Sequence, residues 1–171
     1  MSSQPPYAPP PPPPPVPPAG QPYQPGGAIP LWAPYYGASL GVAFTRFWKK
    51  YTDFSGRASR SEFWWWALVA FLVGIVIEII GLSSGAMGMS MYQSGFTPGA
   101  SFWIVWVVAA AWGLATIIPT LALTWRRLHD TNLAGPFYFL VLVPFVGGII
   151  LLVLTLLPSK PEGARFDRPQ A

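Results

Sequence analysis

The sequence has no cysteine, a single histidine and very few charged residues. The absence of cysteine excludes a disulfide framework, a thiol nucleophile and cysteine-based zinc or iron–sulfur sites. One histidine in 171 residues also excludes histidine-rich metal sites and most acid–base pairs. Charged residues make up 9% of the chain, whereas soluble domains contain about 25%. The chain is therefore not an ordinary soluble globular protein.

Proline and apolar residues are abundant instead, and they occupy different regions. Hydrophobic residues make up 52% of the chain, and 15 of its 22 prolines lie within residues 1–34. The net charge of +4 and the pI near 9.6 raise the question of nucleic-acid binding. The basic residues, however, lie at the ends of apolar runs, where membrane proteins carry them. We therefore expect a membrane protein and no nucleic-acid partner.

The N-terminal region, residues 1–43, is predicted to be a disordered, proline-rich tail. Residues 9–15 are seven consecutive prolines, and no charge precedes Arg46. Because proline fixes φ and lacks an N–H, this run favours an extended polyproline II rod. The tail is either a solvated spacer or a docking segment for an aromatic-lined groove on a protein partner. It lacks the basic start and apolar core of a secretory signal.

Three apolar runs follow, at about residues 63–82, 102–125 and 136–157. Each is long enough to cross a hydrocarbon core of roughly 30 Å as a helix. Glu78 is the one charged residue within them. We therefore predict an all-α integral membrane protein with three transmembrane helices, formed by a membrane domain over residues 44–169. Ser59 and Glu62 match the S-x-x-E capping box at the start of the first helix.

The third run is interrupted by Pro144 and by the Gly147–Gly148 pair. We expect a continuous, kinked crossing there, with a re-entrant hairpin as the open alternative. Five Lys and Arg residues precede the first run, two follow the second and three follow the third. With three crossings, a cytoplasmic N-terminus puts seven basic residues inside and three outside. The positive-inside rule therefore favours a plasma-membrane protein with its N-terminus and tail in the cytoplasm.

Two charged clusters flank the first and second runs on the predicted cytoplasmic side. We expect Arg–carboxylate pairs between them, with Asp130 bound by Arg57 or Arg60 and Glu62 bound by Arg126 or Arg127. Surplus guanidinium groups would then hold phospholipid phosphates or a partner's acidic surface. The alternative is that these charges only set topology. The candidate site residues are Arg57, Arg60, Glu62, Arg126, Arg127, His129 and Asp130.

The sequence offers little support for catalysis or metal binding. His129 and Asp130 are adjacent, and neighbours in sequence rarely orient each other as a catalytic dyad does. Met87, Met89 and Met91 fall within five residues and have thioethers that suit Cu(I). A flexible loop resting on headgroups explains them equally, because no His or Cys reinforces the site. We expect no enzyme activity, no cofactor and no assigned metal.

Four motifs in order carry a family resemblance. They read FSGRASRSEFWWW at 54–66, WRRLHDTNLAG at 125–135, VPFVGGI at 143–149 and PSKPEGARFDRP at 158–169. With the apolar spans between them, they resemble the bacterial inner-membrane family called domain of unknown function 805. The similarity covers roughly residues 44–169. It implies a bacterial plasma-membrane protein, and it implies no catalytic residue, cofactor or substrate.

The chain departs from the family pattern at two points. Gly135, Pro136 and Phe137 stand where members often carry Trp, and Ala164 stands where members tend to carry Asn. The resemblance nevertheless favours a role for the two Arg–carboxylate clusters beyond setting the membrane topology.

Two functional hypotheses remain open. The leading one is a non-enzymatic accessory, anchor or scaffold protein that binds anionic lipid or a protein partner through its cytoplasmic Arg clusters. The alternative is a small transporter or channel subunit. Three helices cannot enclose a pore, so this alternative requires a homo-oligomer, with close helix contacts at Gly74, Gly113 and Gly147–Gly148.

Overall fold

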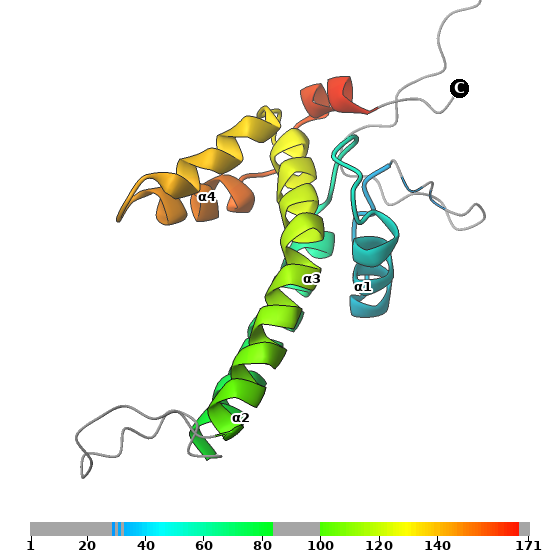
Figure 1. Ribbon diagram of the computed structural model, residues 1–171. Helices are drawn as coiled ribbons and strands as arrows, with labels where there is room; N and C mark the ends of the chain where they lie inside the picture. Colours follow the sequence, from blue (N-terminus) through cyan, green and yellow to red (C-terminus); the bar gives the residue numbers. More distant parts are fainter. Residues whose placement is uncertain (1–28, 30, 32, 84–99, 168–171) are drawn as a thin grey trace, which may run out of the picture.

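The computed structural model shows two long helices side by side, with the shorter elements gathered at one end (Figure 1). The structure describes residues 29, 31, 33–83 and 100–167. Every regular element in this part of the chain is helical. In chain order, the helices are α1 (Leu40–Lys49), α2 (Arg60–Ser83), α3 (Ala100–Asp130), the 3₁₀ helix η1 (Gly135–Leu142), α4 (Gly147–Leu156) and the 3₁₀ helix η2 (Pro161–Phe166).

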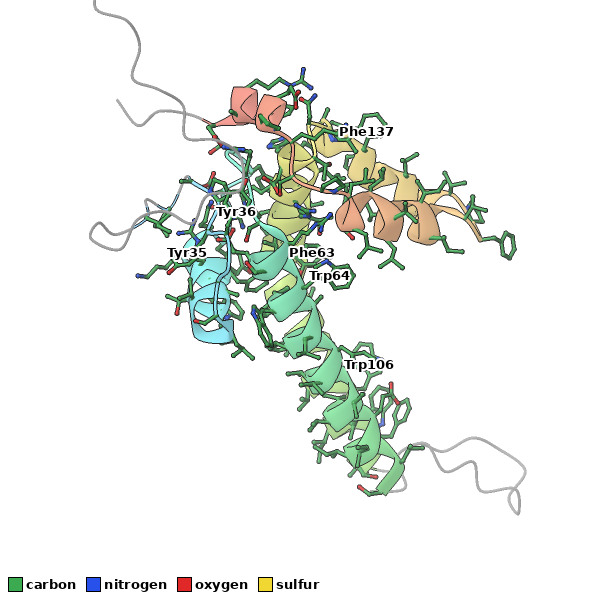
Figure 2. All side chains as sticks on the ribbon, turned by 180° about the vertical axis from the view of Figure 1, so that it is seen from behind. Tyr35, Tyr36, Phe63, Trp64, Trp106 and Phe137 are labelled. Atoms are coloured by element: carbon green, nitrogen blue, oxygen red, sulfur yellow. The ribbon has the colours of Figure 1, made fainter. Side chains whose placement is uncertain are left out.

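Helices α2 and α3 are the two helices, among the described residues, that are long and apolar enough to cross a membrane. At 1.5 Å per residue, the 24 residues of α2 extend about 36 Å. Only 11% of the most apolar window of each helix is buried within the protein. Figure 2 shows their side chains projecting outward, as Trp106 does. A soluble core helix would be mostly covered, so these exposed apolar faces fit lipid.

The predicted capping box at the start of α2 is confirmed. The Glu62 amide donates to the Ser59 hydroxyl at 3.2 Å, and the Ser59 amide donates to Glu62 Oε2 at 2.9 Å. Two backbone N–H groups that would lack helical partners are thereby satisfied. The box ends the preceding loop and sets where the charged residues around Arg60 lie on the helix.

Helix α1 begins at Leu40, and the boundary at residue 43 that composition predicts therefore falls within its first turn. The apolar residues Leu40, Ala43, Phe44 and Phe47 follow helical spacing and give α1 one apolar face. Phe47 stacks on Trp66 of α2 with ring centroids 3.3 Å apart. Together with Ala58 and Leu123, these two rings form the small hydrophobic core at the junction of α1, α2 and α3.

Helix α3 continues through Pro119 as one element. Proline has no N–H, so the carbonyl of Ala115, four residues earlier, loses its helical donor. The Tyr51 hydroxyl donates to this carbonyl at 3.0 Å. The segment after α1 therefore compensates for the proline and is attached to the middle of α3.

The expected kinked crossing of residues 136–157 is wrong, because the run forms a short hairpin of η1 and α4 (Figure 1). The chain reverses at Pro144, and Phe145 adopts a left-handed conformation with φ 64°. Gly147 packs against the Leu140 carbonyl so closely that a Cβ would overlap it. After the hairpin, the amide of Lys160 donates to the Asp130 carbonyl at 2.8 Å. The chain thus returns to the end of α3 from which it left, as in the re-entrant alternative.

The described basic residues consequently gather at one end of the α2–α3 pair, where α2 begins and α3 ends. We call this the charged end. A Cβ added at Gly74 or Gly113 would meet no atom within 4 Å, so these glycines make no close contact within the described part of the chain. The homo-oligomer stays a prediction.

Candidate functional site

Asp130, the last residue of α3, is the centre of a buried polar cluster at the charged end. It is fully buried and accepts hydrogen bonds from Arg127 Nη1 at 2.5 Å, from the Tyr36 hydroxyl at 3.0 Å and from the Ser159 hydroxyl. Arg57 Nη1 lies 4.0 Å from Oδ1, the oxygen that accepts the Tyr36 hydroxyl, whereas Arg127 and Ser159 donate to Oδ2. The predicted pairing of Asp130 with Arg57 is therefore present, but Arg127 makes the closer ion pair. Burial, with the neighbouring Asp130 charge, raises the pKa of Tyr36 to about 12, so this hydroxyl keeps its proton as donor.

Arg57 joins this cluster to the C-terminal segment. Its guanidinium donates to both oxygens of Asp167, with Nη2 2.6 Å from Oδ2. The neighbouring Gly56 amide donates to the Phe166 carbonyl at 3.0 Å. His129 Nδ1 lies 3.0 Å from the Gly56 carbonyl, and its ring stacks on Phe166 with centroids 4.0 Å apart. His129 thus links the end of α3 to the Gly56 loop through a hydrogen bond and to the C-terminal segment through its ring stack.

The end of the η1–α4 hairpin is attached by arginine side chains. Arg127 Nε donates to the Thr155 carbonyl at 3.0 Å, and Arg127 Nη2 donates to the Leu157 carbonyl. Arg60 Nε donates to the same Leu157 carbonyl at 3.1 Å. These carbonyls end α4 and lack helical donors. The two arginines therefore stabilise the return of the chain to the charged end.

Glu62 belongs to a second cluster, and its predicted pairing with Arg126 or Arg127 is wrong. Its partner is Arg46 of α1, whose Nε donates to Oε1. The other carboxylate oxygen accepts the amides of Ser59 and Tyr35. Arg46 also donates to the Ala33 carbonyl. This cluster holds the segment before α1 against the start of α2.

Lys50 and Arg126 are two further buried cations, and the charges of Glu62, Arg46 and Asp53 act on both. Lys50 is 2% exposed and Arg126 is 1% exposed. Arg126 Nε donates to the Ala122 carbonyl of its own helix at 3.1 Å. Burial, and next the charge of Arg126, lowers the pKa of Lys50 to about 7. Two cations thus share a site closed to solvent.

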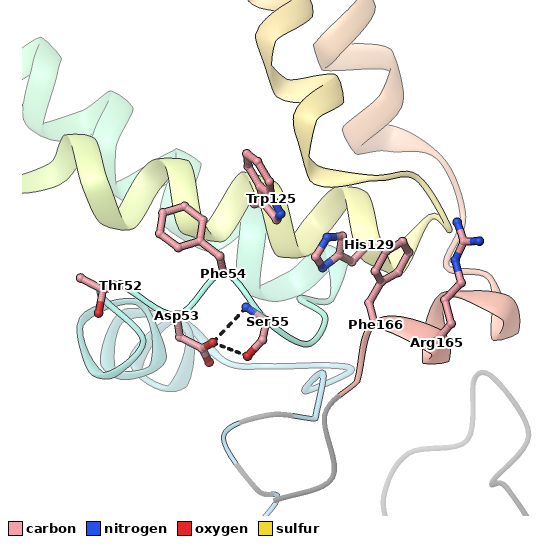
Figure 3. A pocket seen from close by; sticks show the side chains of 8 residues that line it. All are labelled: Thr52, Asp53, Phe54, Ser55, Trp125, His129, Arg165 and Phe166. Atoms are coloured by element: carbon pink, nitrogen blue, oxygen red, sulfur yellow. Dashed lines mark hydrogen bonds between the residues drawn. The ribbon is translucent and has the colours of Figure 1, made fainter.

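An open cleft of about 580 Å³ lies beside these groups (Figure 3). Its lining combines an aromatic stack, a carboxylate and an exposed guanidinium. Asp53 is held in place by the amide and hydroxyl of Ser55, at 3.0 and 2.6 Å from Oδ1. The lining residues are Thr52, Asp53, Phe54, Ser55, Trp125, His129, Arg165 and Phe166.

The structure thus brings the predicted site residues together at one end but distributes them over several contacts. Arg57, Arg127 and Asp130 share one cluster, whereas Glu62 belongs to the next. Sequence reasoning missed the partners that come from distant segments. These are Tyr36, Arg46, Lys50, Ser159 and Asp167. A usable signal was present for Arg46 and Lys50, which are four residues apart at the C-terminal end of α1, where Lys50 is the capping residue.

Within the described ranges, no group of three His, Asp or Glu side chains is placed to hold a metal ion. Met87, Met89 and Met91 lie outside the described residues, as does most of the proline-rich tail.

The Lys50 pKa leads to a pH-dependent stability. Lys50 is neutral above about pH 7 in the folded protein, whereas in the unfolded chain it stays protonated up to about pH 10.4. The unfolded state then binds more protons, so the free energy of unfolding rises with pH in this window, by up to about 1.4 kcal/mol per pH unit.

We expect Lys50→Met to remove this rise between pH 7 and 8.5 in a gluconate buffer, measured by thermal unfolding in detergent. Lys49→Met, on the exposed neighbour, should keep it, and equal slopes in all three proteins would contradict the prediction.

Comparisons with known proteins give a consistent result. The family described as Protein of unknown function (DUF805) matches residues 51–168. The "Inner membrane protein YhaI" of Escherichia coli K12 is 39% identical over 105 residues, which cover 61% of this chain and 75% of that protein. The "Inner membrane protein YhaH" of the same strain is 28% identical over 123 residues, which cover 69% of this chain and 87% of that protein. No solved structure matches the chain significantly.

Proposed function

This chain belongs to the DUF805 family, and from that premise we propose that it is a non-enzymatic accessory or anchor protein of the bacterial inner membrane. In this proposal α2 and α3 cross the bilayer, and the charged end lies in the cytoplasm. The relatives are named as inner membrane proteins, and both long helices have uncovered apolar faces. The charged end would bind anionic headgroups and so fix the protein's depth and orientation.

The distribution of basic residues supports this orientation. The loop between α2 and α3 contains no Lys or Arg. Because the η1–α4 hairpin returns the chain to Asp130, the basic residues after it join those around α2 and α3. The excess of basic residues on one side of the membrane is therefore larger than the seven-to-three division expected for three crossings. Positive residues are retained on the cytoplasmic side, and this rule supports a cytoplasmic position for both the N-terminal and the C-terminal segment.

The exposed charge at this end carries the lipid-binding part of the proposal. Arg57, Arg126 and Arg127 are committed to internal contacts and are largely or fully buried. The side chains that reach solvent are mainly basic, with Glu162 and Asp53 as opposing acids. We call the exposed basic residues the basic rim: Lys49, Arg60, Lys160 and Arg165. Of the seven residues predicted from sequence, only Arg60 belongs to the rim. Each basic residue near an anionic membrane surface contributes about 1 kcal/mol of attraction.

We expect Lys49→Gln/Lys160→Gln to reduce the preference for phosphatidylglycerol over phosphatidylethanolamine by up to about 30-fold, because two such contributions are removed. Neither side chain has a hydrogen bond or ion pair within the part of the chain that the structure describes, so folding should be unaffected. The measurement is native mass spectrometry of lipids retained from mixed nanodiscs, with added salt expected to weaken the wild-type preference.

The matched control is Glu78→Gln, which changes one exposed charge within α2, away from its charged end. It should leave the lipid preference unchanged. A double variant that retains phosphatidylglycerol as the wild type does would refute lipid binding by the rim. Arg126→Glu is unsuitable for this test, because it would introduce a charge reversal at a buried position.

A further inference from the structure

Two buried donor atoms of cationic side chains at the charged end lack a hydrogen-bond acceptor among the described residues. Lys50 Nζ and Arg126 Nη2 are closed to solvent, and neither donates to any atom of the described residues. Lys50 follows α1, and Arg126 lies near the end of α3. The charge of Arg126 acts on Lys50, and the charges of Glu62, Arg46 and Asp53 act on both groups. Buried ammonium and guanidinium groups are almost always paired, because removing their hydration is costly.

The carboxylates nearby are already occupied. Glu62 accepts Arg46 at one oxygen and two backbone amides at the other. Asp53 uses Oδ1 for Ser55. Its Oδ2 lies 4.0 Å from Lys50 Nζ, beyond hydrogen-bond distance. The group therefore contains three cations, Arg46, Lys50 and Arg126, but only two anions, so one positive charge is left uncompensated.

Two processes could relieve this excess charge. Lys50 could lose its proton, or a small anion could enter and accept hydrogen bonds from both cations. Deprotonation of Lys50 would leave Arg126 charged and its Nη2 without an acceptor, since a guanidinium stays protonated in proteins. An anion would satisfy Nζ and Nη2 together, through the charge-assisted hydrogen bonds that both groups favour.

We propose that Lys50 and Arg126 form a binding site for one small anion, of the size of chloride or a short carboxylate, at the junction of α1, α2 and α3. This site is separate from the basic rim, because its donors are buried and its ligand carries no lipid chain. Asp53 borders both the site, through Lys50, and the open cleft of Figure 3. The cleft therefore supplies the access route, with the Asp53 side chain moving aside as the anion passes.

An anion in this position would also hold Lys50 in its protonated form. The charged groups that face Lys50 are Arg46 on α1, Glu62 on α2, Arg126 on α3 and Asp53 in the following loop. Adding one negative charge to this set raises the Lys50 pKa from about 7 toward its usual value. Binding should therefore be stronger at pH 6 than at pH 8.5, because at the higher pH protonating Lys50 opposes it.

The test is thermal unfolding of the full chain in uncharged detergent at constant ionic strength, with sodium gluconate replaced stepwise by sodium chloride or sodium acetate. Wild-type protein at pH 6 should show a saturable rise in midpoint of roughly 5–10 °C at a hundredfold excess over the dissociation constant. The rise should be smaller at pH 8.5. In Lys50→Met and in Arg126→Met the rise should be lost, whereas Lys49→Met should keep it.

Lys50→Met also separates anion binding from a general effect on folding. It removes the buried charge, so in gluconate at pH 6 its midpoint should exceed that of the wild type, and chloride should reduce the difference. A wild-type midpoint that does not respond to either anion would overturn the proposal, as would a response retained in Lys50→Met. Neither result bears on lipid retention by the basic rim, which is measured with other variants.

Discussion

Asp130→Asn is expected to reduce the free energy of unfolding by about 3–5 kcal/mol, the usual cost of removing one partner from a buried ion pair. Asp130 is fully buried and accepts hydrogen bonds from Arg127, Tyr36 and Ser159. Asparagine has nearly the same shape but only one acceptor oxygen, and its amide would place a donor against these donors. The buried Arg127 charge would then lack its carboxylate.

The measurement is equilibrium unfolding in detergent, together with limited proteolysis after Leu157. The Asp130 carboxylate accepts the Ser159 hydroxyl, whereas the Lys160 amide donates to the main-chain carbonyl that asparagine keeps. Loss of the Ser159 contact should therefore loosen the segment after Leu157 and expose it to protease before α3 unfolds. Asp167→Asn is the matched control, since this carboxylate pairs with Arg57 near the surface and its loss should cost less. A change below about 1 kcal/mol in Asp130→Asn would show that Asp130 is not the centre of the cluster.

Gly147→Ala is expected to destabilise the protein by about 1–3 kcal/mol, as overpacking does. Gly147 begins α4 where this helix packs on η1, and a Cβ there would overlap the Leu140 carbonyl oxygen. Backbone cannot move aside as a flexible side chain can, so the hairpin would have to open. The adjacent Gly148 provides a close control, because a Cβ at that position meets no atom within 4 Å.

Gly148→Ala should stabilise the helix by about 0.5–1 kcal/mol, since alanine loses less conformational freedom than glycine in a helix. The two single variants, one residue apart, should therefore shift the unfolding midpoint in opposite directions. Equal shifts in both variants would indicate that η1 and α4 do not pack as described, and would revive the continuous crossing of residues 136–157.

The two long helices could be predicted from sequence because their signal is local. The runs 63–82 and 102–125 lie within α2 and α3, and uninterrupted apolar length is enough to identify them. The third run has similar composition, but its structure depends on a conformation at Phe145 and on the approach of Gly147 to Leu140. Composition does not encode either feature, so the reversal of the chain could not be deduced.

The sequence indicated which charged residues lie near one another at the charged end, but it did not indicate which arginine pairs with which carboxylate. The proximity of Arg57 and Asp130 could be predicted, because the start of the first apolar helix and the end of the second lie on the same side of the membrane. The choice of Arg46 for Glu62 depends on where α1 packs, and that packing is decided by Phe47 against Trp66. Tyr36 lies 94 residues from Asp130 in sequence. No spacing rule reaches across such a separation, because the contact exists only once the helices have associated.

The long separations within the Asp130 cluster have a consequence for biogenesis. Arg127 and Asp130 leave the ribosome before Ser159, Phe166 and Asp167, whose contacts complete the charged end. Until these later residues have emerged, the partly assembled charges must stay hydrated, while α2 and α3 are already apolar enough to enter lipid. Membrane insertion should thus precede formation of the charged cluster. The segment 159–167 would then act as the closing element of the fold, because its contacts with Asp130 and Arg57 form only after the two long helices are in place.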